Sequence, residues 1–180
     1  LTNNNIKKLM NEKADLVLFT TKQDDKVLET VTAKNFSVQE YSKTEDEEAT
    51  YITIDVSNGG LRKTDYKQWV SLQKDIKSTS NKNIFILMKG TLESFSDVRE
   101  KKAFVDTLCD LKRSTSKNIW LIYQGDYTTY SMERGIKHLI IGNEWIDKTE
   151  PLEVAKNTKC LIITLDGKNL TYEIKNIFEK

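Results

Sequence analysis

Three short apolar segments, separated by helix-like stretches, constrain the fold of this chain most strongly. They are residues 51–56 (YITIDV), 83–88 (NIFILM) and 118–123 (NIWLIY). Apolar runs of this length, rich in isoleucine and aromatic residues, are typical of strands that are buried on both faces of a sheet. Loops that follow such strands display functional side chains in α/β proteins, so we expect any site to lie in the loops after these segments.

Two segments between these strands have the periodicity of amphipathic helices. In the first, Thr64 is expected to cap a helix that runs to about Lys77. In the second, Asp97 and Glu100 are expected to form a capping pair for a helix that ends near Arg113. Apolar residues recur every three or four positions in both and predict the buried faces: Tyr66, Trp69, Leu72 and Ile76 in the first, and Phe104, Val105, Leu108 and Leu111 in the second.

Further strand patterns lie on both sides of this central part. Residues 15–21 and 137–141 are predicted strands, and residues 36–41 are a candidate short strand. Residues 160–165 and 170–175 flank Asp-Gly, a strong signal for a hairpin. A helix at residues 27–33, an acidic loop at 44–48 and a long loop at 142–158 complete the prediction. The order predicts an α/β fold, specifically a mixed-sheet α/β sandwich that ends in a C-terminal β-hairpin.

Composition limits the classes of partner. The chain has 180 residues, 38% hydrophobic and 31% charged, which suits one globular domain over residues 1–180. Lys and Arg number 28 against 27 for Asp and Glu, and this near-neutral balance argues against a nucleic-acid or anionic-membrane binder. No apolar run approaches the roughly 18 residues of a membrane span, so we expect no membrane insertion. Because the sequence begins with Leu1 and lacks a signal peptide, we expect it to be a piece of a longer protein.

Residues that commonly bind zinc or act as nucleophiles are scarce. Cys109 and Cys160 are expected to be buried free thiols, although a disulfide or a catalytic thiol stays open. His138 is the one histidine of the chain, and its place in a strand pattern predicts a surface or partly buried side chain. Two cysteines and one histidine do not suffice for a typical zinc site. The glycine patterns of nucleotide-binding loops are also missing from the sequence.

Several blocks of the chain together resemble the calcineurin-like metallophosphoesterase fold. Residues 11–25 (NEKADLVLFTTKQDD) are similar to the segment in which that family has a strand followed by Gly-Asp. Residues 51–76 (YITIDVSNGGLRKTDYKQWVSLQKDI) resemble its next strand and helix, and residues 83–90, 97–126 and 135–142 resemble later blocks. The phrases YITIDVSNGGLRKTDYKQW and FSDVREKKAF and the final hairpin look like a histidine-poor branch of this fold. That branch occurs in secreted Gram-positive proteins beside phosphodiester-glycosidase or other cell-envelope modules.

The resemblance implies a site that has lost its metals. Members of the family hold two metal ions that polarise phosphate and generate hydroxide. Where they have Gly-Asp, this chain has Thr21-Lys22; the histidine loop reads Met88-Lys89-Gly90, and the Gly-His-x-His loop reads Gly125-Asp126-Tyr127-Thr128. We therefore expect no catalytic residue, no metal ligand and no cofactor. The residues expected to line the former cleft are Lys22, Asp55, Lys89, Asp126 and Tyr127.

Three functional hypotheses follow. The first is a non-catalytic accessory domain, with a binding or structural role, of a larger extracellular or cell-envelope protein. The second is a divergent phosphodiester or phosphomonoester hydrolase with a carboxylate-only metal site built from Asp24, Asp25, Asp55 and Asp126. The third is an unrelated intracellular α/β protein. For the first, the expected partners are other domains of the parent protein, with cell-wall carbohydrate as an alternative that Trp145 would bind by stacking.

Overall fold

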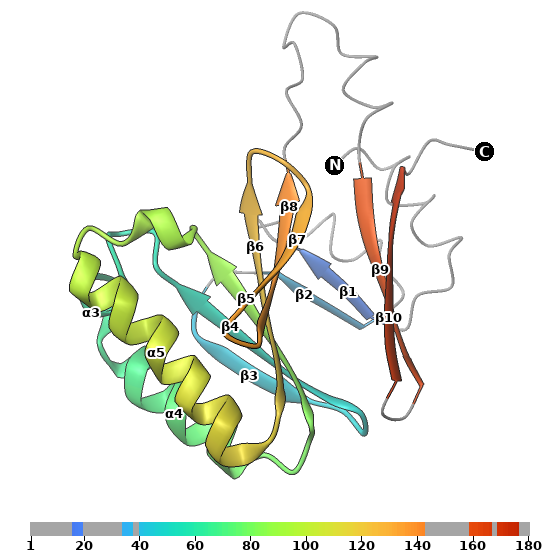
Figure 1. Cartoon of the computed structure of the whole chain (residues 1–180), viewed down its shortest axis with the longest axis horizontal. Coiled ribbons are helices and arrows are strands. Elements are labelled where there is room, and N and C mark those ends of the chain that lie inside the picture. Colours follow the sequence, from blue (N-terminus) through green and yellow to red (C-terminus); the bar gives the residue numbers. More distant parts are fainter. Residues whose placement is uncertain (1–15, 20–33, 38–39, 143–158, 167–168, 177–180) are drawn as a thin grey trace, which may run out of the picture.

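The computed structural model describes residues 16–19, 34–37, 40–142, 159–166 and 169–176, and a six-stranded sheet lies at its centre (Figure 1). Its strand order is β3-β4-β5-β6-β8-β7. The four inner strands run parallel, and the two edge strands run antiparallel to their neighbours. The strands are β3 (Ser42–Glu45), β4 (Ala49–Asp55), β5 (Asn83–Lys89), β6 (Asn118–Gly125), β7 (Thr129–Glu133) and β8 (Ile136–Gly142).

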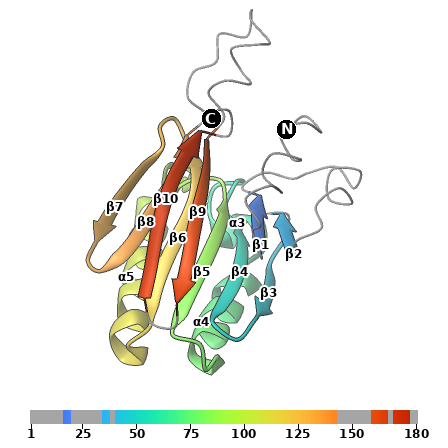
Figure 2. The same cartoon turned by 90° about the vertical axis from the view of Figure 1, so that its right-hand side faces the viewer.

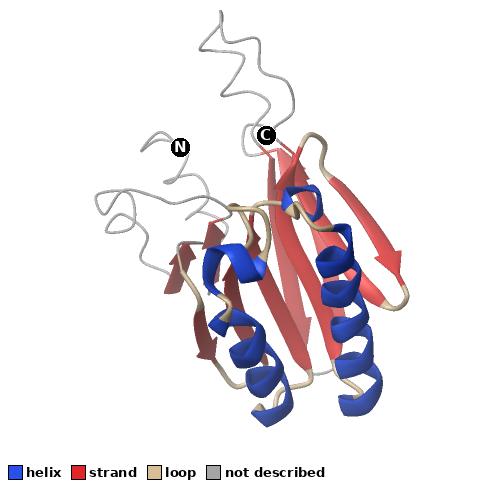
Figure 3. Cartoon of the chain, turned by 90° about the vertical axis from the view of Figure 1, so that its left-hand side faces the viewer, coloured by secondary structure: helices blue, strands red, loops and turns tan. Residues whose placement is uncertain are grey.

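Helices cover one face of this sheet, and a β-hairpin covers the other (Figures 2 and 3). The helical layer consists of α3 (Leu61–Asp65), α4 (Lys67–Ser78), the 3-10 turn η1 (Leu92–Ser94) and α5 (Val98–Thr115). The hairpin consists of β9 (Lys159–Asp166) and β10 (Asn169–Asn176), which pair antiparallel. A parallel pair, β1 (Leu16–Phe19) and β2 (Lys34–Ser37), forms a separate small sheet. The α/β sandwich and the C-terminal hairpin expected from the sequence are both present.

Alternate residues of the inner strands build two apolar layers. Side chains such as Ile52, Ile86 and Leu121 belong to the core beneath the helices. Phe85 and Trp120 point to the opposite face, where Ile163 and Tyr172 of the hairpin pack near them. Because both faces are covered, the inner strands carry continuous apolar runs instead of an alternation of apolar and polar residues.

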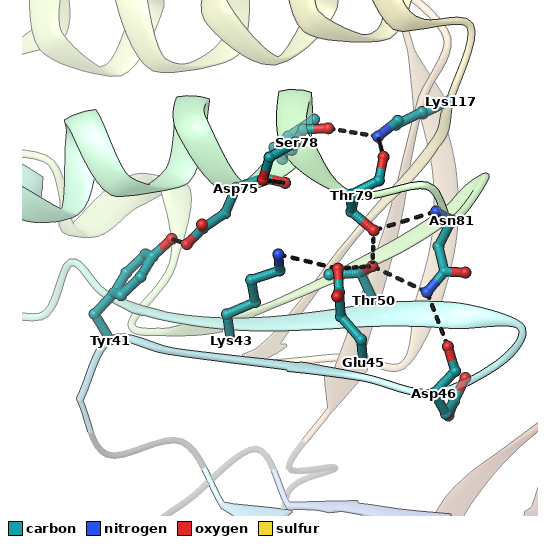
Figure 4. A network of polar contacts seen from close by, with 11 residues as sticks. Tyr41, Lys43, Glu45, Asp46, Thr50, Asp75, Ser78, Thr79, Asn81 and Lys117 are labelled. Atoms are coloured by element: carbon teal, nitrogen blue, oxygen red, sulfur yellow. Dashed lines mark hydrogen bonds and ion pairs between the residues drawn. The ribbon is translucent and has the colours of Figure 1, made fainter.

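Polar side chains close the amino-terminal edge of the sheet (Figure 4). The buried Thr50 hydroxyl lies 2.7 Å from that of Thr79, at the end of α4, and accepts a hydrogen bond from the side-chain Nδ2 of Asn81. Lys117, also buried, donates through Nζ to the carbonyl oxygens of Ile76 and Thr79. A cation at this position satisfies carbonyl groups left unpaired at a helix C-terminus and complements the helix dipole.

The first helical segment differs from the prediction at its start. The chain enters α3 directly after Gly60, and Thr64, predicted as the cap, lies inside α3 and donates its hydroxyl hydrogen to the Gly60 carbonyl. Tyr66, predicted to be buried, is 65% exposed. The buried face follows Gln68, Leu72 and Ile76 at intervals of one turn, which leaves Tyr66 on the outer side.

For the second helix, the predicted apolar face is confirmed, and the predicted cap is confirmed only in part. Its four predicted core residues, Phe104 among them, are buried. Asp97 accepts a hydrogen bond from the Arg99 amide at 2.8 Å, as an N-cap does. Glu100 does not complete a capping box, because its carboxylate accepts a hydrogen bond from the backbone of Arg62 instead.

Three smaller expectations need correction or fall outside the described residues. β3 takes up the first part of the acidic loop predicted at 44–48, and β2 ends at Ser37, within the strand predicted at 36–41. β7 was not predicted, because its residues are mostly exposed and its alternation is limited to Tyr130 and Met132 between polar residues. The helix at 27–33 lies outside the described residues, as does the loop predicted at 142–158 beyond Gly142.

The aromatic contact between the helices gives a test of the core. Phe104 is fully buried and packs edge-on against the half-buried Trp69, with ring centroids 6.4 Å apart. We expect Phe104→Ala to lower the free energy of unfolding by about 3–5 kcal/mol. Trp69→Ala should cost less, about 1–3 kcal/mol, since part of its surface is already in water. Urea melts measure both, and Val98→Ala on the exposed start of α5 should change stability by less than about 0.5 kcal/mol. An equal cost for all three variants would contradict this packing.

Candidate functional site

An ion pair between neighbouring strands marks the carboxyl-terminal edge of the sheet. Asp55 ends β4 and lies opposite Lys89, which ends β5. The Lys89 Nζ atom is 2.7 Å from Asp55 Oδ2, and the Asp55 side chain is 11% exposed against 44% for Lys89. The second carboxylate oxygen of Asp55 accepts hydrogen bonds from the Ser57 amide at 2.8 Å and from the Ser57 hydroxyl at 2.6 Å. Both oxygens of the carboxylate are thus engaged within the chain.

Gln68 holds the backbone of Asp55 from the helical side. Its side chain is buried, accepts from the Asp55 amide at 2.7 Å and donates to the Asp55 carbonyl at 3.1 Å. The pairing of β3 with β4 ends at Thr53, so the edge strand supplies no partner for these two groups. A buried backbone amide or carbonyl without a partner is costly, and the glutamine replaces the missing strand.

The environment of Asp55 favours its charged form. Burial has the largest single effect and raises the pKa of this carboxyl. The hydrogen bonds from Lys89 and Ser57 lower the pKa, and their combined effect is larger than that of burial. The net result is a pKa below the ordinary value for aspartate. Asp55 is therefore an ionised partner for Lys89 at neutral pH and a poor general base.

The loops that follow β4 and β5 are bound to each other. The Gly59 carbonyl accepts hydrogen bonds from both the amide and the hydroxyl of Ser96, each at 3.1 Å. The Val56 amide donates to the Lys89 carbonyl at 2.9 Å. The two loops therefore form one hydrogen-bonded unit over the ends of these strands.

A second buried carboxylate lies at the start of α3. Glu100 is almost fully buried and accepts a hydrogen bond from the Arg62 amide at 2.9 Å. Gly60 has φ +125°, and a Cβ atom at this position would lie 3.0 Å from the carboxylate of Glu100. Both the backbone conformation and the close approach explain why glycine occurs here.

The structure places some of the predicted cleft residues and leaves others outside the described part. Asp55 and Lys89 form a direct pair, and Asp126 and Tyr127 follow β6 at the same edge of the sheet. Tyr127 is 67% exposed. Within the described ranges, Asp126 forms no ion pair. Lys22, Asp24, Asp25 and Trp145 lie outside those ranges.

Sequence reasoning missed Ser57 and Gln68, which organise this edge, and it assigned Glu100 to a capping pair instead of the contact with Arg62. Gln68 carried a readable signal, because it lies one turn before Leu72 on the buried helix face. In the described segments, no group of three or more His, Cys, Asp or Glu side chains is arranged to hold a metal ion. The search for membrane-spanning helices, limited to the same segments, found none that is long and apolar enough.

His138 is more deeply buried than the sequence suggested. Only 3% of its surface is exposed, and it lies edge-on to Tyr123 with ring centroids 6.3 Å apart. Its Nε2 atom is buried and has no hydrogen-bond partner among the described residues. Burial lowers the pKa of His138, and the opposing effect of Glu133 does not compensate. The imidazole is therefore neutral at pH 7.

Comparison with known proteins gives little further information. No protein-family model matches this sequence, and comparison with curated proteins finds no significant match. A similar solved structure is described as "GAP50 the anchor in the inner membrane complex of Plasmodium". The similarity covers 78% of this chain and 65% of that chain, with 12% sequence identity and a TM-score of 0.48. This chain thus spans slightly less than two thirds of the other, and such a similarity identifies neither a family nor a function.

Removing the ammonium group tests the strand-end pair. We expect Lys89→Met to lower stability by about 1–3 kcal/mol at neutral pH, because Asp55 then keeps a largely buried charge without its cation. The pKa of Asp55 is lowered in the folded state, so its contribution is present above the ordinary value of 3.8 and is lost as pH falls through the folded pKa. The loss of stability caused by Lys89→Met should therefore become smaller as the pH falls below 3.8. Lys101→Met breaks a pair with the exposed Glu93 and should cost less than about 1 kcal/mol.

The buried histidine predicts an acid-sensitive stability. The unfolded chain binds a proton at His138 near the ordinary pKa of 6.5, whereas the folded protein binds it only at lower pH. Stability should therefore fall as pH drops below 6.5, by up to about 1.4 kcal/mol per pH unit. Thermal melts between about pH 7.5 and pH 5 measure this loss, and His138→Leu should reduce it. The same slope in both proteins would show that other groups cause the acid sensitivity.

Proposed function

We propose that this chain is a non-catalytic domain with a metallophosphoesterase-like fold, which serves a larger extracellular or cell-envelope protein by binding or structural support. The observation that carries the proposal is the 2.7 Å contact between Lys89 and Asp55 at the carboxyl edge of the sheet. In the resemblance drawn from the sequence, this is the edge at which the enzymes of the family hold their metals.

The pair supports a binding or structural role because it supplies a cation from the chain itself. A divalent metal site needs carboxylate or imidazole groups that are free to coordinate. Here one oxygen of Asp55 faces the Lys89 ammonium, and the other is occupied by the amide and hydroxyl of Ser57. A metal ion near Asp55 would have to displace these partners and would be repelled by Lys89.

The hydrogen bonds between the two loops favour the same interpretation. Catalysis in this family depends on open coordination positions at the strand ends. The contacts of Gly59 with Ser96 join the loops after β4 and β5 directly. The exposed Tyr127 lies at the same edge and is available for contact with a partner. Other domains of the parent protein are the partners we propose.

Metal titration and a phosphodiesterase assay together test this proposal. Calorimetry of the purified chain with Mn²⁺, Mg²⁺ and Zn²⁺ should show no tight stoichiometric binding. Bis(p-nitrophenyl) phosphate should not be hydrolysed above the rate of a heat-inactivated sample in the presence of any of these ions. Metal-dependent hydrolysis that disappears in Asp55→Asn would instead establish the carboxylate-only hydrolase. Hydrolysis that survives that substitution would contradict the assignment of the site.

A further inference from the structure

The outer side of the first helical segment carries lysines around two exposed apolar side chains. Tyr66 has helical backbone angles, so α3 leads into α4 with only a local break between them. All members of the group are exposed, and Tyr66 and Val70 are each 65% exposed. The group, called the lysine face below, consists of Lys63, Tyr66, Lys67, Val70, Lys74 and Lys77.

The positive charge of this face is not neutralised within the described part of the chain. None of its four lysines takes part in any of the ion pairs there. The two acidic residues of α3 and α4 form no ion pair with these lysines: Asp65 accepts from the Lys67 amide at 3.0 Å, and Asp75 accepts from the Tyr41 hydroxyl at 2.7 Å. Even with both carboxylates counted, the two helices carry five basic residues against two acidic ones. The net charge of +1 for the whole chain therefore conceals a local concentration of positive charge.

On the neighbouring helix α5, several basic residues have acidic partners. On α5, Asp110 pairs with Arg113, and Asp106 pairs with Arg134. Part of the positive charge of α5 is thus neutralised by ion pairs, whereas Arg99, Lys102 and Lys112 take part in none among the described residues. What distinguishes α3 and α4 is that four lysines without an ion pair there surround the exposed Tyr66 and Val70, on a face about 20 Å long.

We propose that the lysine face adsorbs to the surface of an anionic phospholipid membrane. Lysine ammonium groups attract anionic headgroups, each with a modest contribution. Tyrosine is enriched at membrane interfaces, where its ring meets the acyl boundary and its hydroxyl stays in water. Tyr66 and Val70 are one turn apart on the same side of the helix and are placed to enter that boundary together. The protein lies on the membrane in this arrangement and does not cross it.

The composition of the face favours a lipid surface over a nucleic acid. Base and phosphate recognition commonly uses the planar fork of arginine, whereas the cations here are lysines. The one arginine of this segment, Arg62, lies over the Trp69 ring, with its guanidinium carbon 5.9 Å from the ring centroid. Two apolar side chains at the centre of a lysine cluster have an obvious use in a bilayer and none in contact with phosphates alone.

This inference is independent of the function proposed above. The lysine face lies on the outer side of the helical layer, whereas the Lys89–Asp55 pair lies at the end of the sheet strands. If this chain proved to be a metal-dependent enzyme, its lysine face would be unchanged. Either proposal can therefore fail without the other.

Vesicle sedimentation with the full chain tests the inference. We expect binding to vesicles of phosphatidylcholine mixed with phosphatidylserine at low ionic strength, and little binding to phosphatidylcholine alone. High salt should release the protein, because screening shortens the reach of the lysine charges. Lys67→Gln with Lys74→Gln should weaken the partition coefficient by about 25-fold, at roughly five-fold per lysine. Tyr66→Ala, added to these two substitutions, should lower the partition coefficient further while the remaining binding still decreases with salt.

A matched charge change on the adjacent helix is the control. Arg99→Gln with Lys102→Gln also removes two positive charges, but from the exposed side of α5. It should leave vesicle binding within about two-fold of the unsubstituted chain if the lysine face is responsible. An equal loss in both double variants would overturn the proposal, as would equal binding to neutral vesicles. Binding to heparin or duplex DNA without binding to anionic vesicles would overturn it as well. Circular dichroism of each variant confirms that the fold is retained.

Discussion

The burial of the parallel strands β4, β5 and β6 on both faces is the constraint on which the rest of the structure depends. Strands covered by helices on one side and by a hairpin on the other have little contact with water except at their ends. Polar groups at those ends need partners from within the chain. At the amino edge, Thr79 provides one for the buried Thr50. At the carboxyl edge, Gln68 does the same for the backbone of Asp55. Both partners come from α4 or its C-cap, so this helix stabilises the two edges of the sheet at once.

The sequence was most informative where burial alone decides the structure. The three apolar segments correspond to β4, β5 and β6 within one or two residues, because a run of Ile, Leu and aromatic residues of that length has few alternatives to a doubly covered strand. The apolar face of α5 followed for the same reason. The hairpin at the C-terminus was recognisable from Asp-Gly between two alternating runs, which favours a tight turn.

The sequence was least informative where a local signal competes with a distant partner. Asp97 and Glu100 have the spacing of a capping pair, but Glu100 binds the Arg62 amide, 38 positions earlier in the chain. The first helical segment begins directly after Gly60, where the absence of a Cβ atom leaves room for the Glu100 carboxylate, and a pattern search has no access to such a contact. The burial of His138 was missed for a similar reason: its neighbour in the sheet is Ser131 of β7, a strand too polar to be recognised from the sequence.

The carboxyl edge of the sheet is held together by an ion pair within the chain. Carboxylates gathered around a metal repel each other when the metal is absent, so such a site is stable only when loaded. A single carboxylate paired with a lysine is neutral without any ligand, and the lowered pKa of Asp55 shows that its charged form is favoured in the folded chain. Lys89 remains partly exposed, so water reaches the pair and limits its contribution to stability.

The more important consequence is geometric: with Asp55 held by Lys89, Ser57 and Gln68, the ends of β4 and β5 and the loops after them have a fixed arrangement. A preformed edge of this kind is what the binding role proposed above would require, because little of it would have to be ordered on contact with a partner.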